Sequence, residues 1–191
     1  MIEELSIEDK PNYSIEQLYD SKENISLIKE FEANEKGKGL EYYLKEAAEH
    51  DENANLARTY LVKDSVTREL VAYFSLRTGL ITIQVQNNSF DSYPAIELSN
   101  FAVNVGYKRK HPEVEGLGKY IFRNFIMPLV KKIAKYVGVY SLYIYALPEE
   151  KLINYYGKLG FSRLPDAMEK FVQQHVKPKY DEGCIFMFQT I

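Results

Sequence analysis

The sequence predicts an α/β protein of the α+β kind, in which a mixed, mostly antiparallel sheet is flanked by helices. Before residue 50, apolar residues recur at spacings of three and four, which is typical of helices. Between residues 59 and 85, apolar and polar residues alternate, which is typical of strands. After residue 95, strand-like and helix-like segments follow one another in turn.

Helical spacing and strand alternation define the elements of the N-terminal half. Residues 14–34 are predicted to form one helix, or two with a break near residues 21–24. A further helix spans about 39–50, and a polar loop follows it. Strands are expected at 59–62, 70–77 and 81–85, with a hairpin over 63–69 and a loop over 87–94.

The C-terminal half is predicted to contain three strands and two clear helices. A helix of about residues 116–137 carries Pro128, which should kink it because proline removes a backbone donor. The helix that begins near Pro148 ends at Gly160, and residues 165–180 are polar and partly helical. Strands are expected at 96–105, 140–146 and 183–191.

Size and composition predict one domain over residues 1–191, with an N-terminal helical extension of about residues 1–35. No run approaches the roughly 18 apolar residues of a membrane span. The acidic N-terminus does not resemble a signal peptide. The single cysteine, Cys184, excludes an intrachain disulfide, and a cytoplasmic location is the default expectation.

Charge is distributed unevenly along the chain. Residues 1–55 carry a balance of −9 and residues 56–191 a balance of +6, within a total of −3. This asymmetry reflects either solubility alone or the handling of a polyanion. Basic residues are concentrated between 108 and 135: Lys108, Arg109, Lys110, Lys119, Arg123, Lys131, Lys132 and Lys135.

The stretch EVEGLG, residues 113–118, lies between a predicted strand and a predicted helix. The first amides of a helix have no acceptor inside it, and together with the helix dipole they attract anions. Glycines at 116 and 118 allow a phosphate to approach the backbone, although the same pair is equally compatible with a plain turn. The sequence lacks both G-x-x-x-x-G-K-[ST] and G-x-G-x-x-G, which disfavours an NTPase or a Rossmann dehydrogenase.

Two further motifs accompany this loop. The segment NYYGKLGF, residues 154–161, resembles the FY-x-x-x-GF signature of the GNAT superfamily of N-acetyltransferases, and Ser99–Val103 resembles their acetyl-CoA strand. The glycine loop is similar to their pyrophosphate loop, Q/R-x-x-G-x-G/A. The three motifs follow the order of the family, and the resemblance covers about residues 30–190.

The resemblance implies an acetyl-CoA-dependent N-acetyltransferase with acetyl-CoA as co-substrate and no metal. It implies that Tyr156 returns a proton to the departing thiolate and that Glu97 is a general base, although Glu97 is equally able to pair with a basic side chain. The residues implied to bind the cofactor are Phe101, Ala102 and Val103 of the strand, and Val114, Glu115, Gly116, Leu117, Gly118 and Lys119 of the loop.

The acceptor amine is left open by the sequence. The leading expectation is a primary amine of a small molecule or protein. Residues 31–76 and 145–147 also resemble the GNAT toxins of toxin–antitoxin pairs, which acetylate aminoacyl-tRNA, although those toxins are usually more basic than this chain, with its pI near 5.7. Glu113 departs from the loop pattern and motivates a third reading, a non-catalytic acyl-CoA binder. No membrane association is expected, and a homodimer is a further option.

Overall fold

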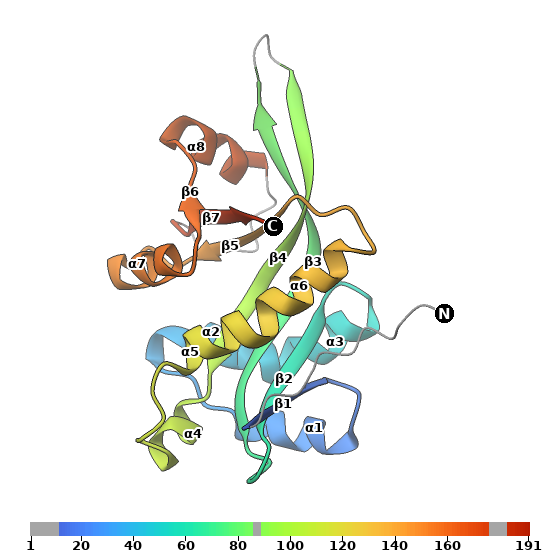
Figure 1. Ribbon diagram of the computed structural model, residues 1–191, viewed down its shortest axis with the longest axis vertical. Coiled ribbons are helices and arrows are strands. Elements are labelled where there is room, and N and C mark those ends of the chain that lie inside the picture. Colours follow the sequence, from blue (N-terminus) through green and yellow to red (C-terminus); the bar gives the residue numbers. More distant parts are fainter. Residues whose placement is uncertain (1–11, 86–88, 176–182) are drawn as a thin grey trace. The chain divides into compact units, whose positions relative to one another are not determined.

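The computed structural model describes residues 12–85, 89–175 and 183–191 (Figure 1). Its strands form one mixed sheet in the order β1-β2-β3-β4-β5-β7-β6. The pairs β1–β2, β2–β3, β5–β7 and β6–β7 are antiparallel, and β4–β5 is parallel, so the predicted fold class is confirmed. The strands are β1 (Tyr13–Gln17), β2 (Arg58–Asp64), β3 (Leu70–Gln84), β4 (Phe90–Val103), β5 (Ser141–Ala146), β6 (Ser162–Arg163) and β7 (Ile185–Thr190).

The helices connect and flank these strands (Figure 1). They are α1 (Lys22–Leu27), α2 (Lys38–Tyr42), α3 (Ala48–Asn53), α4 (Val105–Lys110), α5 (Leu117–Ile121), α6 (Met127–Ala134), α7 (Glu150–Lys158) and α8 (Asp166–His175). A π-helical turn, Tyr43–Ala47, joins α2 to α3, and another, Phe122–Ile126, joins α5 to α6. Within the described ranges, every helix is too short or too polar to cross a membrane.

The chain divides into two compact units. The first comprises the chain up to Arg77 together with Ser99–Leu129, and the second comprises Thr78–Leu98 together with Val130–Ile191. Strands β3 and β4 contribute residues to both units. The expectation of a single domain over residues 1–191 therefore stays a prediction.

The sheet of the first unit is covered on both faces. Because side chains alternate along a strand, Leu61 and Tyr73 point to one face, where they pack in an apolar cluster with Phe31, Leu44 and Ala48 from the α1–α3 region. Tyr13 points to the opposite face, where its ring contacts that of Tyr120 on α5, with centroids 5.5 Å apart. The N-terminal helices and α5 thus hold the strands between them.

The second unit has its own apolar cluster around β5 and β7. Ile81 and Ala95 of the long strands pack there with Tyr143 and Phe186, and Val172 of α8 completes it. The rings of Tyr143 and Phe186 lie 5.5 Å apart. This cluster buries the side of β5 that carries Tyr143.

The prediction of helix at the start of residues 14–34 is wrong, because residues 13–17 form strand β1. Ile15 pairs with Val62 of β2, and Lys63 of β2, which is fully buried, places its ammonium 2.6 Å from the carboxylate of Glu16. These partners lie far away in sequence, so sheet pairing overrides the weak local helical spacing. The helix predicted for the rest of this segment is present as α1 and a short 3₁₀ turn, and residues 1–11 lie outside the described part of the chain.

Several other boundaries differ from expectation. The strands predicted at 70–77 and 81–85 form one continuous strand, β3, and β4 begins at Phe90 within the predicted loop. The strand predicted to reach residue 105 ends at Val103, and residues 105–110 form α4. The helix predicted at 116–137 spans 117–134, and its π-helical turn ends two residues before Pro128, which has no backbone N–H to donate to the helix.

Candidate active site

The predicted pyrophosphate loop leads into the start of α5. Gly116 is the N-cap of this helix and adopts the left-handed conformation, with φ of 67°, which favours glycine. A Cβ built at Gly116 would meet no atom within 4 Å. The amides of Leu117, Gly118 and Lys119 begin a helical run that continues through the π-turn to Ala134, so they lie at the positive end of its dipole. This geometry can accept an anion.

The predicted acetyl-CoA strand is the last part of β4. Phe101, Ala102 and Val103 are half-buried, and Ala102 packs against the apolar cluster of the first unit. Across the described residues, β4 pairs with β5 only over Ala95–Glu97. The β4 backbone at Phe101–Val103 therefore has one edge that is not used by β5, which is the requirement for pairing with an extended ligand.

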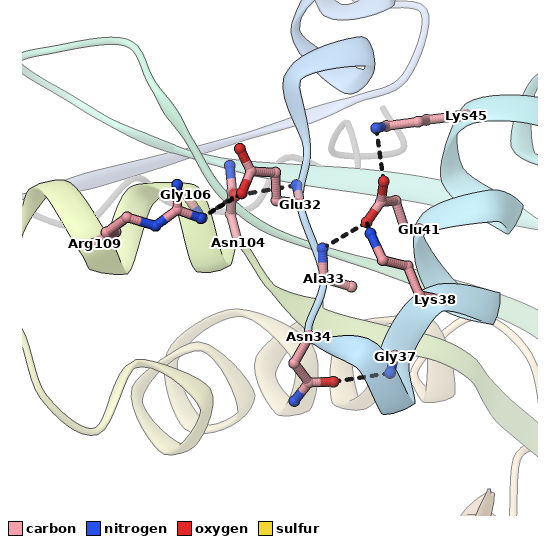
Figure 2. Close-up of polar contacts among 10 residues, drawn as sticks. All are labelled: Glu32, Ala33, Asn34, Gly37, Lys38, Glu41, Lys45, Asn104, Gly106 and Arg109. Carbon is pink, nitrogen blue, oxygen red and sulfur yellow. Dashed lines mark hydrogen bonds and ion pairs between the residues drawn. The ribbon is translucent and has the colours of Figure 1, made fainter.

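Asn104 fixes the end of this strand, as Figure 2 shows. Its Oδ1 accepts hydrogen bonds from the backbone N–H of Glu32 (3.2 Å) and of Gly106 (2.9 Å). Its Nδ2 donates to the carbonyl of Leu70 (2.7 Å). The backbone N–H of Asn104 also donates to Val71 (2.8 Å). One buried side chain thus joins β4, β3, α4 and the N-terminal segment beside the predicted cofactor strand.

The segment that follows Glu32 is held by a second polar group (Figure 2). Glu41 of α2 accepts hydrogen bonds from the ammonium groups of Lys38 (2.8 Å) and Lys45 (3.0 Å) and from the backbone N–H of Ala33 (2.9 Å). These contacts, that of Lys38 foremost, lower the pKa of Glu41 to about 2. The Glu41 carboxylate therefore stays ionised and keeps the start of α2 attached to the preceding chain.

Tyr156 lies in the last turn of α7 and is partly exposed. Its ring packs between those of Tyr155, at 5.3 Å, and Phe161, at 5.6 Å. The turn after α7 brings Phe161 back to Tyr156, because Gly160 adopts a φ of 101°. The backbone N–H of Phe161 donates a hydrogen bond to the carbonyl of Tyr156. Burial of the phenol, with a smaller contribution from Tyr155, raises the pKa of Tyr156 above its usual value of 10.0.

Glu97 lies on β4 in the second unit and is 4% exposed. It is paired in the parallel register with Tyr143 of β5, whose hydroxyl donates a hydrogen bond of 3.0 Å to its carboxylate. Gly79 of β3 faces the same tyrosine, and a Cβ at residue 79 would overlap the Tyr143 ring. The glycine thus provides the space in which Tyr143 reaches Glu97.

We expect Gly79→Ala to destabilise the protein and to displace Tyr143 from Glu97. Overpacking of a buried ring typically costs about 1–3 kcal/mol. Chemical denaturation of the two proteins measures this loss, and Leu80→Ala, which alters an exposed neighbour in the same strand, is the matched control. Equal unfolding free energies for Gly79→Ala and wild type would contradict the steric account.

The predicted site residues fall into two groups. Phe101–Val103 and the loop of Val114–Lys119 belong to the first unit, and Glu97 and Tyr156 belong to the second. Sequence reasoning did not identify Asn104 or Tyr143. The signal for Asn104 was its place as an N-cap residue before α4, which was hidden because the segment was interpreted as strand.

The described ranges contain no cluster of three or more His, Cys, Asp or Glu side chains that could hold a metal ion. Cys184, the single cysteine of the sequence, is buried directly before β7. The candidate groups are therefore the backbone amides of the first unit and, in the second unit, the phenol of Tyr156 and the carboxylate of Glu97.

No family model matches the sequence. The chain is similar in structure to a tyrosine-to-phenylalanine mutant of KacT, with 20% identity and a TM-score of 0.67 over 94% of this chain and 95% of that chain. It is also similar to AtaT complexed with acetyl-methionyl-tRNA, with 18% identity and a TM-score of 0.68 over 94% and 95% of the two chains. AtaTR bound with acetyl-CoA matches with 19% identity and a TM-score of 0.63 over 95% and 94%. These likenesses show that the chain has the fold of KacT and AtaT.

Proposed function

We propose that this GNAT-fold protein is an acetyl-CoA-dependent N-acetyltransferase that transfers an acetyl group directly from the thioester to a primary amine. The observation that carries the proposal is the match of nearly the whole chain to structures with acetyl-CoA or an acetylated aminoacyl-tRNA bound. The three motifs support it independently, because each lies on the element that its proposed role requires.

Cofactor binding is assigned to the first unit. The amides at the start of α5 would receive the pyrophosphate, with the glycines leaving the backbone accessible. The edge of β4 at Phe101–Val103 would pair with the pantetheine arm, and Asn104 holds that strand in place. Fixing the thioester in this way removes entropy from the reaction before the chemical step, worth up to roughly 7–11 kcal/mol in well-oriented cases.

The chemical step forms one bond and breaks another. The neutral amine attacks the thioester carbonyl carbon to form the amide bond, the carbon–sulfur bond breaks, and the sulfur leaves as the thiolate of CoA. The amine nitrogen loses one proton, and the thiolate takes one up. Two proton-transfer groups are therefore needed, one basic and one acidic.

Tyr156 is assigned as the acid. Its raised pKa keeps the phenol protonated throughout the neutral range, so a proton is present when the thiolate forms. Its hydroxyl makes no hydrogen bond to another described residue, so it is available to a ligand. The packing of its ring between Tyr155 and Phe161 restricts the orientation of the hydroxyl.

Glu97 is assigned as the base, acting directly or through a water molecule. Its carboxylate is buried, and the hydrogen bond from Tyr143 orients it on β4. A carboxylate held this way can accept the proton that the amine releases. Replacing Glu97 by Gln keeps the shape and removes the proton acceptor, so it supplies a control for the assay below.

The α-amino group of an aminoacyl-tRNA is the second candidate acceptor, favoured by the similarity to AtaT complexed with acetyl-methionyl-tRNA. The basic cluster at 108–135 is only partly available for phosphates, because Arg109 pairs with Glu32 (2.5 Å) and Lys110 pairs with Glu69 (2.6 Å). Since tRNA binding draws on several phosphate contacts, these ion pairs count against tRNA, although aminoacyl-tRNA is the acceptor that fits the similar structures best.

The test is release of CoA thiol from acetyl-CoA by the full chain, with a panel of small amines, lysine peptides, charged tRNA and uncharged tRNA. We expect acceptor-dependent release, mass spectrometry showing one added acetyl group, and loss of activity in Glu97→Gln. Acetylation of charged but not uncharged tRNA would select the second candidate. Binding of acetyl-CoA without release for any acceptor would instead identify a non-catalytic acyl-CoA binder and overturn the proposal.

A further inference from the structure

A cluster of three residues joins the end of α4 to the start of β3. Glu69 precedes β3, and its two carboxylate oxygens have separate partners on consecutive residues. Lys110 Nζ lies 2.6 Å from Oε1, and His111 Nε2 lies 2.8 Å from Oε2. We name Glu69, Lys110 and His111 the Glu69 clamp. It connects segments more than 40 residues apart, and all three residues belong to the first unit.

His111 is also the first residue of the loop that leads to α5. It follows the last helical residue of α4, and its carbonyl accepts the N–H of Val114 at 3.1 Å, which closes a turn. Gly116, the left-handed N-cap of α5, lies two residues further on. The position of the predicted phosphate-binding amides therefore depends on where His111 is anchored.

The surroundings of His111 favour its protonated form. Its side chain is 24% exposed, and its ring stacks on that of the buried Tyr107 at 4.2 Å, an arrangement that suits an imidazolium. The carboxylate of Glu113 lies 3.7 Å from Nδ1, and Asp64, which accepts a hydrogen bond from Tyr107, adds negative charge.

The pKa shifts of His111 and Glu69 both favour the charged forms of these two side chains. The hydrogen bond that His111 donates to Glu69, followed by the negative charges around it, raises the pKa of His111 above its usual 6.5. The hydrogen bond from Lys110, and then that from His111, lowers the pKa of Glu69 to about 2. Lys110 shares the same carboxylate, and Tyr13 faces Tyr107 from β1. Near pH 6, His111 is therefore protonated and Glu69 is ionised.

We propose that His111, anchored on Glu69, is a positioning residue for the pyrophosphate loop, so that acetyl-CoA binds most tightly when His111 is protonated. This inference rests on the proposed cofactor site. Because the pKa of His111 is raised by folding, the contribution of protonated His111 to the clamp is complete below about pH 6.5 and is lost as the pH rises through its pKa in the folded protein.

Glu69→Gln distinguishes two effects of Glu69 on acetyl-CoA affinity: the anchoring of His111, and the repulsion between the Glu69 charge and the bound anion. The substitution removes a negative charge near a site for an anion, so the field alone predicts tighter binding of acetyl-CoA. Loss of the anchor predicts weaker binding, by about threefold for a partly exposed pair. Glu113→Gln is the matched control, since it removes the same charge from an exposed side chain with only a long contact to His111.

The experiment is calorimetric titration of acetyl-CoA into wild type, Glu69→Gln, His111→Gln and Glu113→Gln at pH 6 and pH 9, on full-length proteins whose folding is checked by thermal unfolding. At each pH, the affinity of a variant is divided by that of wild type, so that any change in the protonation of acetyl-CoA itself cancels. We expect Glu69→Gln and His111→Gln to bind about threefold more weakly at pH 6. At pH 9, His111→Gln should approach wild type, whereas Glu69→Gln should keep a smaller deficit, because its contact with Lys110 is still lost. Glu113→Gln should bind equally or more tightly at both.

Two failures are distinguishable. Wild type that binds acetyl-CoA while Glu69→Gln binds as tightly or more tightly at pH 6 overturns the positioning role and leaves the proposed function standing. Wild type that binds no acetyl-CoA at either pH overturns both. A readout without ligand, the NMR titration of the His111 ring, should show a pKa above 6.5 that falls in Glu69→Gln, and an unchanged value in the variant would also overturn the clamp.

Discussion

Tyr156→Phe is expected to lower kcat by roughly tenfold or more, on the magnitudes typical of general acids, with little change in acetyl-CoA affinity. The substitution removes only the hydroxyl, and the ring contacts with Tyr155 and Phe161 are retained. The thiolate of CoA would then leave without its proton donor, while the predicted cofactor contacts lie on residues of the other unit. Steady-state kinetics with a saturating acceptor, together with calorimetry, measures the two quantities separately.

Tyr155→Phe is the matched control for this prediction. Tyr155 is the preceding residue of α7, and its buried hydroxyl has no hydrogen-bond partner within the described ranges. Burial raises the pKa of Tyr155 to about 12, so both phenols are protonated at neutral pH and differ in position rather than in charge. We expect Tyr155→Phe to retain kcat. Unaltered turnover in Tyr156→Phe, or equal losses in the two variants, would remove Tyr156 from the role of acid.

The parts of the site that are local in sequence were predictable. Tyr156 and Phe161 are five residues apart, and a helix followed by a left-handed glycine brings their rings together whatever the rest of the fold does. The start of α5 was found in the same way, because a glycine N-cap and an apolar helical run are adjacent in the chain. Helical and strand periodicity likewise located most elements to within a few residues.

The contacts between distant segments were not predictable. Tyr143 reaches Glu97 across 46 residues, His111 reaches Glu69 across 42, and Asn104 reaches Glu32 across 72. Each depends on sheet order and register, which a single sequence does not specify. Strand β1 was misassigned for the same reason, since its partner, β2, lies more than 40 residues away.

Gly118→Asp is expected to weaken acetyl-CoA binding by about tenfold or more, an estimate for a carboxylate placed within about 4 Å of a phosphate at an intermediate dielectric constant. Gly118 is the second residue of α5, among the amides proposed to hold the pyrophosphate. The new side chain puts a negative charge, as well as a Cβ, at the place where the anion is to lie. Calorimetric titration of acetyl-CoA measures the loss.

Gly118→Asn separates the two components, because asparagine has nearly the same shape as aspartate without its charge. We expect its affinity to lie between wild type and Gly118→Asp, and equal affinity for wild type and Gly118→Asp would refute the loop assignment.

The stability of the free Gly118→Asp protein should change in the opposite direction to its acetyl-CoA affinity. A carboxylate in the first turn complements the helix dipole, and replacing glycine within a helix typically adds about 0.5–1 kcal/mol. Because the thermal midpoint of Gly118→Asp is thus expected to stay level or to rise while binding falls, misfolding cannot account for the loss, and repulsion at the helix start is left as its cause.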